Sequence, residues 1–415
     1  MSDLLFLAHR LPYPPDKGDK IRSWPILRYL AARHRVHLGT FYDDPRDTAH
    51  IPALEQICAS VCALPLRPLP ARVRSLVGLA TGEALSARYF RDRRLMAWID
   101  KTVARVRPRA AFVYCSAMAP YVTGLALERR VIDMVDLDSE KWLSYAEAGG
   151  WLAPLYGREA RRLLALERRA ASEFDATLFV SMTEAERLEH RAPECAARVH
   201  VMPNGIDLDR FNPDRAYPNP FPRGRRAAVF TGAMDYRPNA DAACWFGNEV
   251  VPRLRRRWSN IDFWIVGANP TRAVRRLCSD ANIRVTGRVP DVRPYLAHAD
   301  MAVAPLRLAR GLQNKVLEAM AMAKPLIATP LALAAFGFAR NEEVFAAATP
   351  AEFVDMIALA LSAKGRAVGL RGRARVAAEY RWETRLPLLD TLLAEAPVAP
   401  ALLPAEKPLV LAAAS

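Results

Sequence analysis

The sequence lacks the cysteine spacings and the long apolar runs that mark disulfide-stabilised, metal-binding or membrane-spanning chains. Its six cysteines are scattered over 415 residues, and the one close pair, Cys58 and Cys62, has a C-x3-C spacing typical of neither zinc nor redox sites. We therefore expect buried thiols in a reducing compartment. Residues 325–339 are a run of 15 without a charged residue, and the longest such run, residues 110–127, has 18, whereas a membrane-spanning helix needs about 20. No basic segment opens the chain, so we expect no signal peptide and a cytoplasmic protein, soluble or peripheral to the membrane.

Acidic residues are also scarce, since 44 Asp and Glu stand against 59 Lys and Arg, a formal net charge of +15. This imbalance indicates an anionic partner, namely nucleic acid, a lipid surface or a phosphorylated small molecule. The excess is concentrated in residues 67–109, which hold eleven basic and three acidic residues. Arg88, Arg91, Arg94 and Lys101 fall at helical spacing there. They predict a basic helix face that could contact anionic lipid headgroups, and a solvated helix face is the plainer alternative.

Short apolar segments alternate with longer amphipathic segments along the chain. Because the short segments are continuously apolar, they predict strands covered on both faces, and their alternation with helices predicts parallel sheets. The expected strands are residues 3–8, 35–41, 111–115, 131–135 and 176–181, then 227–231, 261–266, 283–286, 301–304 and 326–328. The predicted fold class is α/β, with two Rossmann-like parallel-sheet domains and a ligand cleft at the carboxyl ends of their strands.

A turn at residues 203–205 and a segment with four prolines at 211–226 separate the two sets of strands. The expected parts are a first domain at residues 1–205, a second domain at 206–381, a closing helix at about 382–396 that packs back on the first domain, and a disordered tail at 397–415.

The segment most suggestive of chemistry follows the strand expected at residues 301–304. Gly311 lies in a loop that opens a helix, where exposed amides and the positive end of the helix dipole suit a phosphate group. Lys315 in the first turn could reach the same anion, and the Glu318 carboxylate could accept both hydroxyl groups of a ribose. The alternative is an amphipathic core helix in which Lys315 and Glu318 form a solvated pair.

Two further loops follow expected strands. Gly232 could admit a phosphate, with Arg237 as its bidentate partner, although a plain turn with Asn239 as a helix cap would look the same. The loop Gly287-Arg288-Val289 could pair with a nucleobase through its backbone. Each pattern is weak when taken alone.

Taken together, these segments resemble known sugar transferases. Four of the segments resemble glycosyltransferase family 4: Gly232, residues 287–289, Glu318-Ala319-Met320-Ala321 and the interdomain residues 202–207. Members of this family have the GT-B fold. Residues 9–22 and 309–315 resemble the sugar transferases linked to bacterial exopolysaccharide and exosortase (PEP-CTERM) loci. The resemblance spans about residues 1–395. It implies transfer of a sugar, with retention, from a nucleotide diphosphate donor to a lipid-linked or polysaccharide acceptor. It also implies that residues 1–205 form the acceptor-binding domain and residues 206–381 the nucleotide-sugar-binding domain.

The resemblance and the loop chemistry together give a set of expected site residues. The expected donor-binding residues are Glu318, Asn314, Gln313, Leu312, Gly311, Gly232, Arg237, Gly287, Arg288 and Val289. The expected catalytic residues are Lys315, Arg310 and Asp138, and the loop expected to face the acceptor and the phosphates contains Lys17, Gly18 and Asp19.

Two departures from the family pattern change the expected charge of the site. Arg310 stands where the family has the first glutamate of an E-x7-E pair, and Ala233 and Pro238 replace basic residues that often follow the family's glycine. We interpret these changes as compensation, in which Arg310 and Lys315, with Arg237, supply the positive charge. Some such charge is needed, because the leaving diphosphate gains negative charge as the glycosidic bond breaks.

The sequence shows no convincing metal site. The D-x-D pair Asp136 and Asp138 follows a strand of the acceptor domain, so we expect no metal cofactor. We regard Asp138 as a candidate activator of the acceptor, although a turn and a cap for the helix near Ser139 would explain the pair more simply.

Three alternatives to a transferase remain open. An epimerase of the same fold would need an acid–base set in the cleft, which we cannot identify. A nucleic-acid-binding module should interleave arginines with exposed aromatic residues, and this chain does not, so we expect no nucleic-acid partner. A degenerate donor-binding protein is the third, because a family glutamate is missing.

Overall fold

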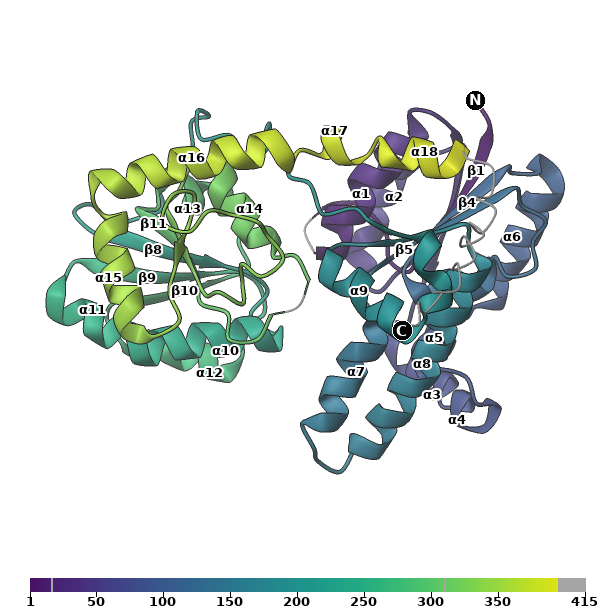
Figure 1. The fold of residues 1–415 in the computed structure, drawn as a ribbon, viewed down its shortest axis with the longest axis horizontal. Coiled ribbons are helices and arrows are strands. Elements are labelled where there is room, and N and C mark those ends of the chain that lie inside the picture. The colour runs from purple at the N-terminus through teal and green to yellow at the C-terminus, as the bar shows by residue number, and fades with distance from the viewer. Residues whose placement is uncertain (16–17, 310, 395–415) are drawn as a thin grey trace, which may run out of the picture.

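The computed structural model describes residues 1–15, 18–309 and 311–394, which form two α/β domains side by side (Figure 1). In spatial order, the first sheet holds β3 (Ser60–Pro65), β2 (Arg35–Tyr42), β1 (Asp3–Ala8), β4 (Ala110–Tyr114), β5 (Arg129–Val135), β6 (Ala176–Phe179) and β7 (Val199–Val201). The second holds β10 (Ile283–Gly287), β9 (Ile261–Val266), β8 (Arg226–Thr231), β11 (Met301–Ala304), β12 (Leu326–Ala328) and β13 (Phe345–Ala346). All neighbouring strands pair in parallel. The predicted fold class is confirmed.

All ten expected strands are present, and the three that the sequence did not predict are β3, β7 and β13. Each of these three lies at the edge of its sheet. Their residues are mostly half-buried rather than buried. An edge strand of this kind needs no continuous apolar run, which is the signal that identified the others.

Helices cover both faces of each sheet (Figure 1). Those of the first domain are α1 (Gly18–Ala31), α2 (Ile51–Glu55), α3 (Pro68–Ser75), α4 (Val77–Thr81), α5 (Leu85–Tyr89), α6 (Arg93–Val106), α7 (Asp138–Glu147), α8 (Ala153–Glu173) and α9 (Met182–Arg191). Those of the second are α10 (Arg237–Trp245), α11 (Val251–Arg257), α12 (Arg272–Arg276), α13 (Arg293–His298), α14 (Asn314–Ala321), α15 (Pro350–Ala360) and α16 (Ala363–Glu379). Among the described residues, no helix is both long enough and apolar enough to cross a bilayer.

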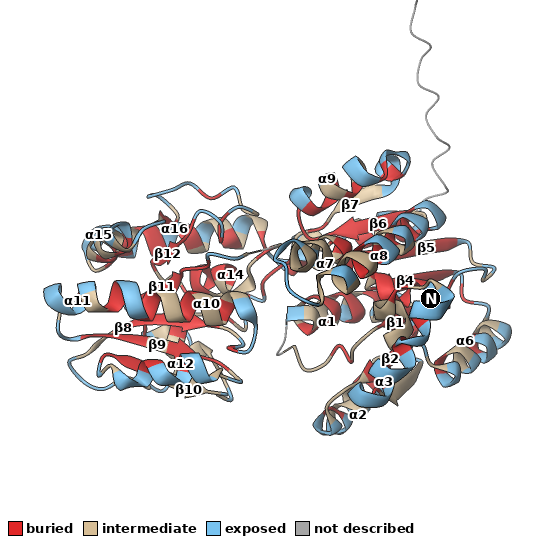
Figure 2. Cartoon of the chain, turned by 90° about the horizontal axis from the view of Figure 1, so that it is seen from below, coloured by how far each residue is buried: buried red, intermediate tan, exposed pale blue. Residues whose placement is uncertain are grey.

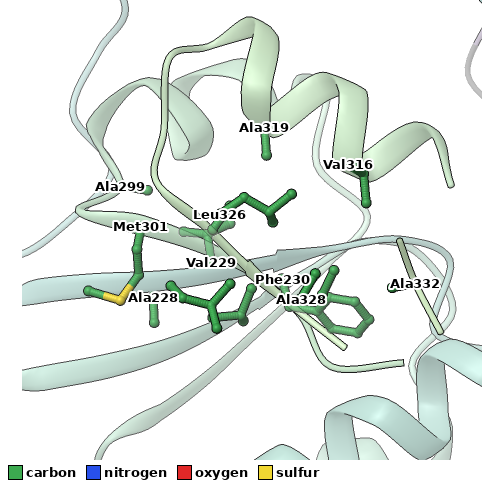
Figure 3. Packing of buried hydrophobic residues seen from close by; sticks show 14 of the residues in the cluster. Ala228, Val229, Phe230, Ala299, Met301, Val316, Ala319, Leu326, Ala328 and Ala332 are labelled. Carbon is green, nitrogen blue, oxygen red and sulfur yellow. The ribbon is translucent and has the colours of Figure 1, made fainter. Parts of the chain in front are cut away.

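Buried apolar side chains fill the space between each sheet and its helices (Figure 2). In the second domain, α14 lies on the sheet through small side chains (Figure 3). Val316 and Ala319 of α14 belong to the same buried cluster as Ala228 and Val229 of β8 and Leu326 of β12. Because these side chains are short, the helix packs closely on the strands, and this packing fixes where its amino end emerges.

The chain crosses between the domains twice, and the two crossings touch. The amide of Ile206 donates to the carbonyl of Tyr380 (2.6 Å), and a Cβ placed on Gly205 would lie 2.6 Å from the Trp382 ring. After the second crossing, α17 (Trp382–Arg385) and α18 (Leu388–Ala394) pack on the first domain through a buried apolar face. The closing helix expected at 382–396 is thus two short helices, because Pro387 between them lacks the N–H that a continuous helix needs. The tail predicted at 397–415 lies outside the described residues.

Candidate functional site

A large cleft lies between the carboxyl ends of the two sheets. It encloses about 1780 Å³ and is lined by residues of both domains, which is ample for a ligand larger than a typical drug molecule. Of the predicted site residues, those that line it are Gly18, Asp19, Gly232, Arg288, Val289, Leu312, Gln313, Asn314, Lys315 and Glu318. The structure therefore brings loops predicted from distant parts of the sequence to one cavity.

Other predicted site residues are placed differently. Those that are described but do not line the cleft are Asp138, Arg237, Gly287 and Gly311. Arg237 is exposed at the first position of α10, so its side chain is not brought to the cavity. Gly287 ends β10, and its neighbours Arg288 and Val289 reach the cleft in its place. Lys17 and Arg310 lie outside the described residues, and their roles stay predictions.

The amino end of α14 opens into the cleft, since residues 312–315 all line it. Gln313 occupies the N-cap position, and its own side chain makes no capping hydrogen bond. Backbone amides at the positive end of a helix dipole favour a bound anion. Lys315 adds a formal positive charge in the same turn.

The ammonium group of Lys315 lies beside Gly232. Its Nζ donates to Asn239 Oδ1 (2.5 Å) and sits 4.7 Å from the centroid of the Phe230 ring. A Cβ placed on Gly232 would lie 3.2 Å from this Nζ and 2.7 Å from the Asn239 amide nitrogen, at a φ of +151° that disfavours other residues. Glycine is therefore required beside the lysine. Burial at the cleft wall lowers the pKa of Lys315 to about 8.

Glu318 follows one turn later and also faces the cleft. Burial raises the pKa of this carboxyl, while the positive charges of Lys315 and Arg210 oppose the rise. Arg210 lines the cleft from the interdomain segment, where its amide bonds to Asp207 (2.8 Å). The sequence analysis did not single out Arg210, although it falls between Asp207 and Phe211 in that segment.

The first domain contributes a cluster of ionised side chains at the end of β1. Arg10 Nη1 donates to Asp19 Oδ2 (2.8 Å), and His9 Nε2 lies 3.5 Å from the same oxygen. Burial disfavours the charged form of His9, but Cys115 and Asp19 outweigh it and raise its pKa to about 10. Burial likewise disfavours the charged form of Asp19, yet His9 and Arg10 hold its pKa well below its usual range. The sequence analysis assigned no role to His9 or Arg10, although both directly follow a strand.

The D-x-D pair splits between two environments. Asp138 begins α7 away from the cleft lining, and burial raises its pKa. Asp136 reaches the second domain: its Oδ1 is buried with no hydrogen-bond partner, and a Cβ placed on Gly311 would lie 2.5 Å from that atom. Burial and the charges of Glu184 and Asp138 raise the pKa of Asp136 to about 7. Over the described part of the chain, no three His, Cys, Asp or Glu side chains are grouped to hold a metal ion, and the absence of a metal cofactor stays a prediction.

A buried polar chain joins the first domain to the start of α14. Arg22, which is fully buried, forms a two-bond pair with Asp133 (2.7 and 3.1 Å) and donates to Asn204 Oδ1 (2.9 Å). The Asn204 amide then donates to Asn314 Oδ1 (2.8 Å). Because Arg22 fixes which way the Asn204 amide points, the first residue of α14 is held in a set position relative to the first domain.

The basic helix face expected within residues 67–109 does not form as predicted. Arg88 lies on α5 and Arg94 on α6, and Asp92 separates the two helices as the N-cap of α6. Arg88 and Arg91 pair with Glu83, and Arg94 pairs with Asp92. Acidic neighbours therefore neutralise much of the charge that the helical spacing indicated.

Two family models match parts of the chain. The model described as "Glycosyl transferases group 1" matches residues 225–363, and the model described as "Glycosyltransferase Family 4" matches residues 142–210. A search of curated proteins found no significant match.

Solved structures match over nearly the whole chain. Sucrose-phosphate synthase from Thermosynechococcus elongatus is 16% identical with a TM-score of 0.69, and the match covers 94% of this chain and 98% of that one. WaaG, a glycosyltransferase involved in lipopolysaccharide biosynthesis, is 16% identical with a TM-score of 0.67 and coverages of 94% and 100%. HepE from Anabaena, solved with UDP-glucose, is 14% identical with a TM-score of 0.65 and coverages of 95% and 99%. These structures establish the GT-B fold, and with the two family models the chain is a glycosyltransferase.

Proposed function

We propose that this glycosyltransferase moves a sugar from a nucleoside diphosphate sugar, with retention of configuration, to an acceptor held by the first domain. The observation that carries the proposal is the amino end of α14, which opens into the interdomain cleft with Lys315 and Glu318 beside it. The solved complex of HepE with UDP-glucose supports a donor of this class, since HepE has the same fold.

The donor is proposed to lie along the second domain. The diphosphate would contact the α14 amides and the backbone at Gly232, because only glycine leaves room for a ligand there. Glu318 would accept two hydrogen bonds from the ribose diol. The base would lie against Arg288 and Val289, which line the cleft after β10.

Lys315 is proposed to neutralise the leaving diphosphate. Its Nζ lies beside Gly232 although Ala233 and Pro238 replace the family's basic residues after that glycine. A fixed charge aimed at a developing anion in a dry site contributes several kcal/mol, on the order of 3. Arg310 would add to this charge, on the strength of the sequence pattern alone.

The acceptor is proposed to be a lipid-linked or growing polysaccharide, in exopolysaccharide assembly at the cytoplasmic face of a membrane. The resemblance of residues 9–22 and 309–315 to transferases of such loci supports this assignment. Asp136 and Asp138 belong to the first domain, and neither lines the cleft. The unpartnered Oδ1 of Asp136, which lies beside Gly311, makes Asp136 a stronger candidate than Asp138 for contact with the acceptor or the sugar. No metal requirement is expected.

A thermal-shift panel of nucleotide sugars tests this function. A true donor should raise the melting temperature more as its concentration rises. At a concentration one hundred times Kd, the free energy of unfolding should increase by about 2.7 kcal/mol. Glu318→Ala should reduce the shift strongly, while Arg237→Ala, a change at an exposed position outside the cleft, should leave it unchanged. No shift with any nucleotide sugar would refute the proposal.

A further inference from the structure

The outward face of α3 and α4 carries large apolar side chains where a water-facing helix ordinarily carries polar ones. Leu69 is 73% exposed, Val73 68%, Leu76 52%, Val77 48% and Leu79 46%. Leu76 has helical dihedral angles and joins the two helices, so the first four follow the spacing i, i+4, i+7, i+8 of a single helix face. We refer to these five side chains as the α3–α4 ridge. Of the twelve exposed large apolar side chains in the described residues, five belong to it.

The inward face of the same segment is built from small residues. Ala71, Ser75 and Gly78 are buried, and a Cβ on Gly78 would lie 3.1 Å from both the Glu83 carbonyl and the Leu85 side chain. The segment therefore lies close against α5 and places its large side chains outward. This is the reverse of an ordinary amphipathic surface helix, and an exposed apolar group of this size indicates an interaction surface.

The charge around the ridge indicates what it contacts. Arg67, Arg72 and Arg74 are exposed along it, and residues 67–82 contain no acidic residue. These arginines differ from those at 88, 91 and 94, which pair with nearby carboxylates. Within the described part of the chain these three arginines form no salt bridge, although the charge of Arg74 acts on Asp92. Apolar side chains bordered by such arginines complement the acyl boundary and headgroups of an anionic bilayer.

The ridge is fixed to the helical hairpin that starts at the cleft. Arg158 of α8 donates to the carbonyl of Gly78 (2.5 Å), and the Glu159 carboxylate accepts the first amides of α5 (2.8 Å each). Trp151 in the turn between α7 and α8 is 88% exposed. This turn lies at the same end of the first domain as α3 and α4 (Figure 1). Tryptophan favours the membrane interface.

The hairpin also links this end of the domain to the cleft. Lys141 of α7 lines the cleft, and α7 ends six residues later at Glu147, so the helix runs about 9 Å from that residue toward the hairpin tip. A lipid-linked acceptor could span that distance with its head group in the cleft and its lipid in the bilayer.

We propose that the α3–α4 ridge docks the first domain on an anionic lipid bilayer, with Trp151 as a second contact. The use of this surface in catalysis rests on the proposed lipid-linked acceptor, whereas docking itself requires no donor or acceptor. The surface differs from the basic face expected from the sequence, because its apolar side chains insert and its arginines border them.

Flotation of the full-length protein with vesicles tests the proposal, without nucleotide sugar. The vesicles are phosphatidylcholine alone or with about 30 mol% phosphatidylglycerol. The wild type should float with the anionic vesicles, and the triple variant Leu69→Gln/Val73→Gln/Leu76→Gln should lose about tenfold or more of its bound fraction. The matched control is Leu331→Gln/Leu370→Gln, which removes leucines that are 44% and 58% exposed in the second domain, and it should float like the wild type.

Three results would overturn the docking proposal. The first is a wild type that does not float with the anionic vesicles, and the second is a ridge variant that floats like the wild type. The third is a wild type that fails to float but forms a dimer in sedimentation that the ridge variant does not form, which would indicate a protein partner. The thermal shift with the donor should survive in the ridge variant, which shows that the variant is folded. Loss of that shift in the wild type would refute the proposed function and leave the flotation result standing.

Discussion

The two halves of the cleft are built from different parts of the polypeptide. In the second domain, glycines with positive φ directly follow β8 and β9, end β10 and lie before α14, namely Gly232, Gly267, Gly287 and Gly311. In the first domain, the corresponding positions carry side chains. His9 follows β1. Cys115, which follows β4, and Val135, which ends β5, are not glycines although their φ angles are positive, +82° and +68°.

The difference indicates a division of labour. Glycine lets backbone amides approach a ligand, which suits a diphosphate. The first domain instead holds ionisable groups in fixed places. The positive φ angles of Cys115 and Val135 cost about 1–3 kcal/mol each. We infer that the second domain recognises the donor largely through backbone and that the first domain places charge around the acceptor.

The largest expected effect compares the buried ion pair of each domain. Asp133→Ala leaves the fully buried Arg22 charge without its partner, so the free energy of unfolding should fall by about 3–5 kcal/mol. Asp262→Ala removes an equally buried carboxylate, but its partner Arg225 is 31% exposed and can reach water. That loss should be nearer 1.5–3 kcal/mol. Calorimetry of the two variants measures the difference, and an equal or reversed order would contradict the account.

The second effect concerns the backbone of the donor half. Gly311→Ala adds a Cβ at a φ of +59° and 2.5 Å from Asp136 Oδ1, so the affinity for the donor should fall about tenfold through strain and steric conflict. Adding Asp136→Ala removes the conflict but not the strain, and should restore part of the affinity. The control is Gly337→Ala, where a Cβ meets nothing within 4 Å. Isothermal titration measures all four proteins, and a Gly311→Ala variant with unchanged Kd would show that the loop does not contact the donor.

The smallest effect is a pH dependence that belongs to the donor half. Because burial lowers the pKa of Lys315 to about 8, its positive charge is present at pH 7 and is lost as the pH rises through 8. Turnover should therefore fall about fourfold between pH 7 and pH 8.5. Lys315→Arg keeps its charge throughout this range and should flatten the profile, even if its turnover is lower. A wild-type profile that is flat to pH 9 would exclude this role.

The contrast between the domains also explains how much the sequence could predict. The central strands were predictable because parallel strands buried on both faces are continuously apolar, while β3 and β7 were missed because edge strands are not. The loop before α14 was predictable from the order of Gly311, Lys315 and Glu318 after a strand.

The remaining site residues depend on tertiary geometry. The positive charge of Arg210 acts on Glu318 across the cleft that both residues line, and no local sequence pattern encodes that arrangement. Arg237 looked equivalent to Lys315 in sequence, yet its position on α10 leaves it exposed. Likewise, Arg88 and Arg94 had helical spacing, and the cap at Asp92 breaks the helix between them.

The central claim is that the Lys315 ammonium stabilises the departing diphosphate while backbone binds the donor. Single-turnover rates and donor affinity for Lys315→Ala, measured beside Arg237→Ala, test it most directly. The account predicts a rate about 100-fold lower for Lys315→Ala with the donor Kd largely preserved, and no change in either quantity for Arg237→Ala. A Lys315→Ala enzyme that turns over at the wild-type rate would contradict it.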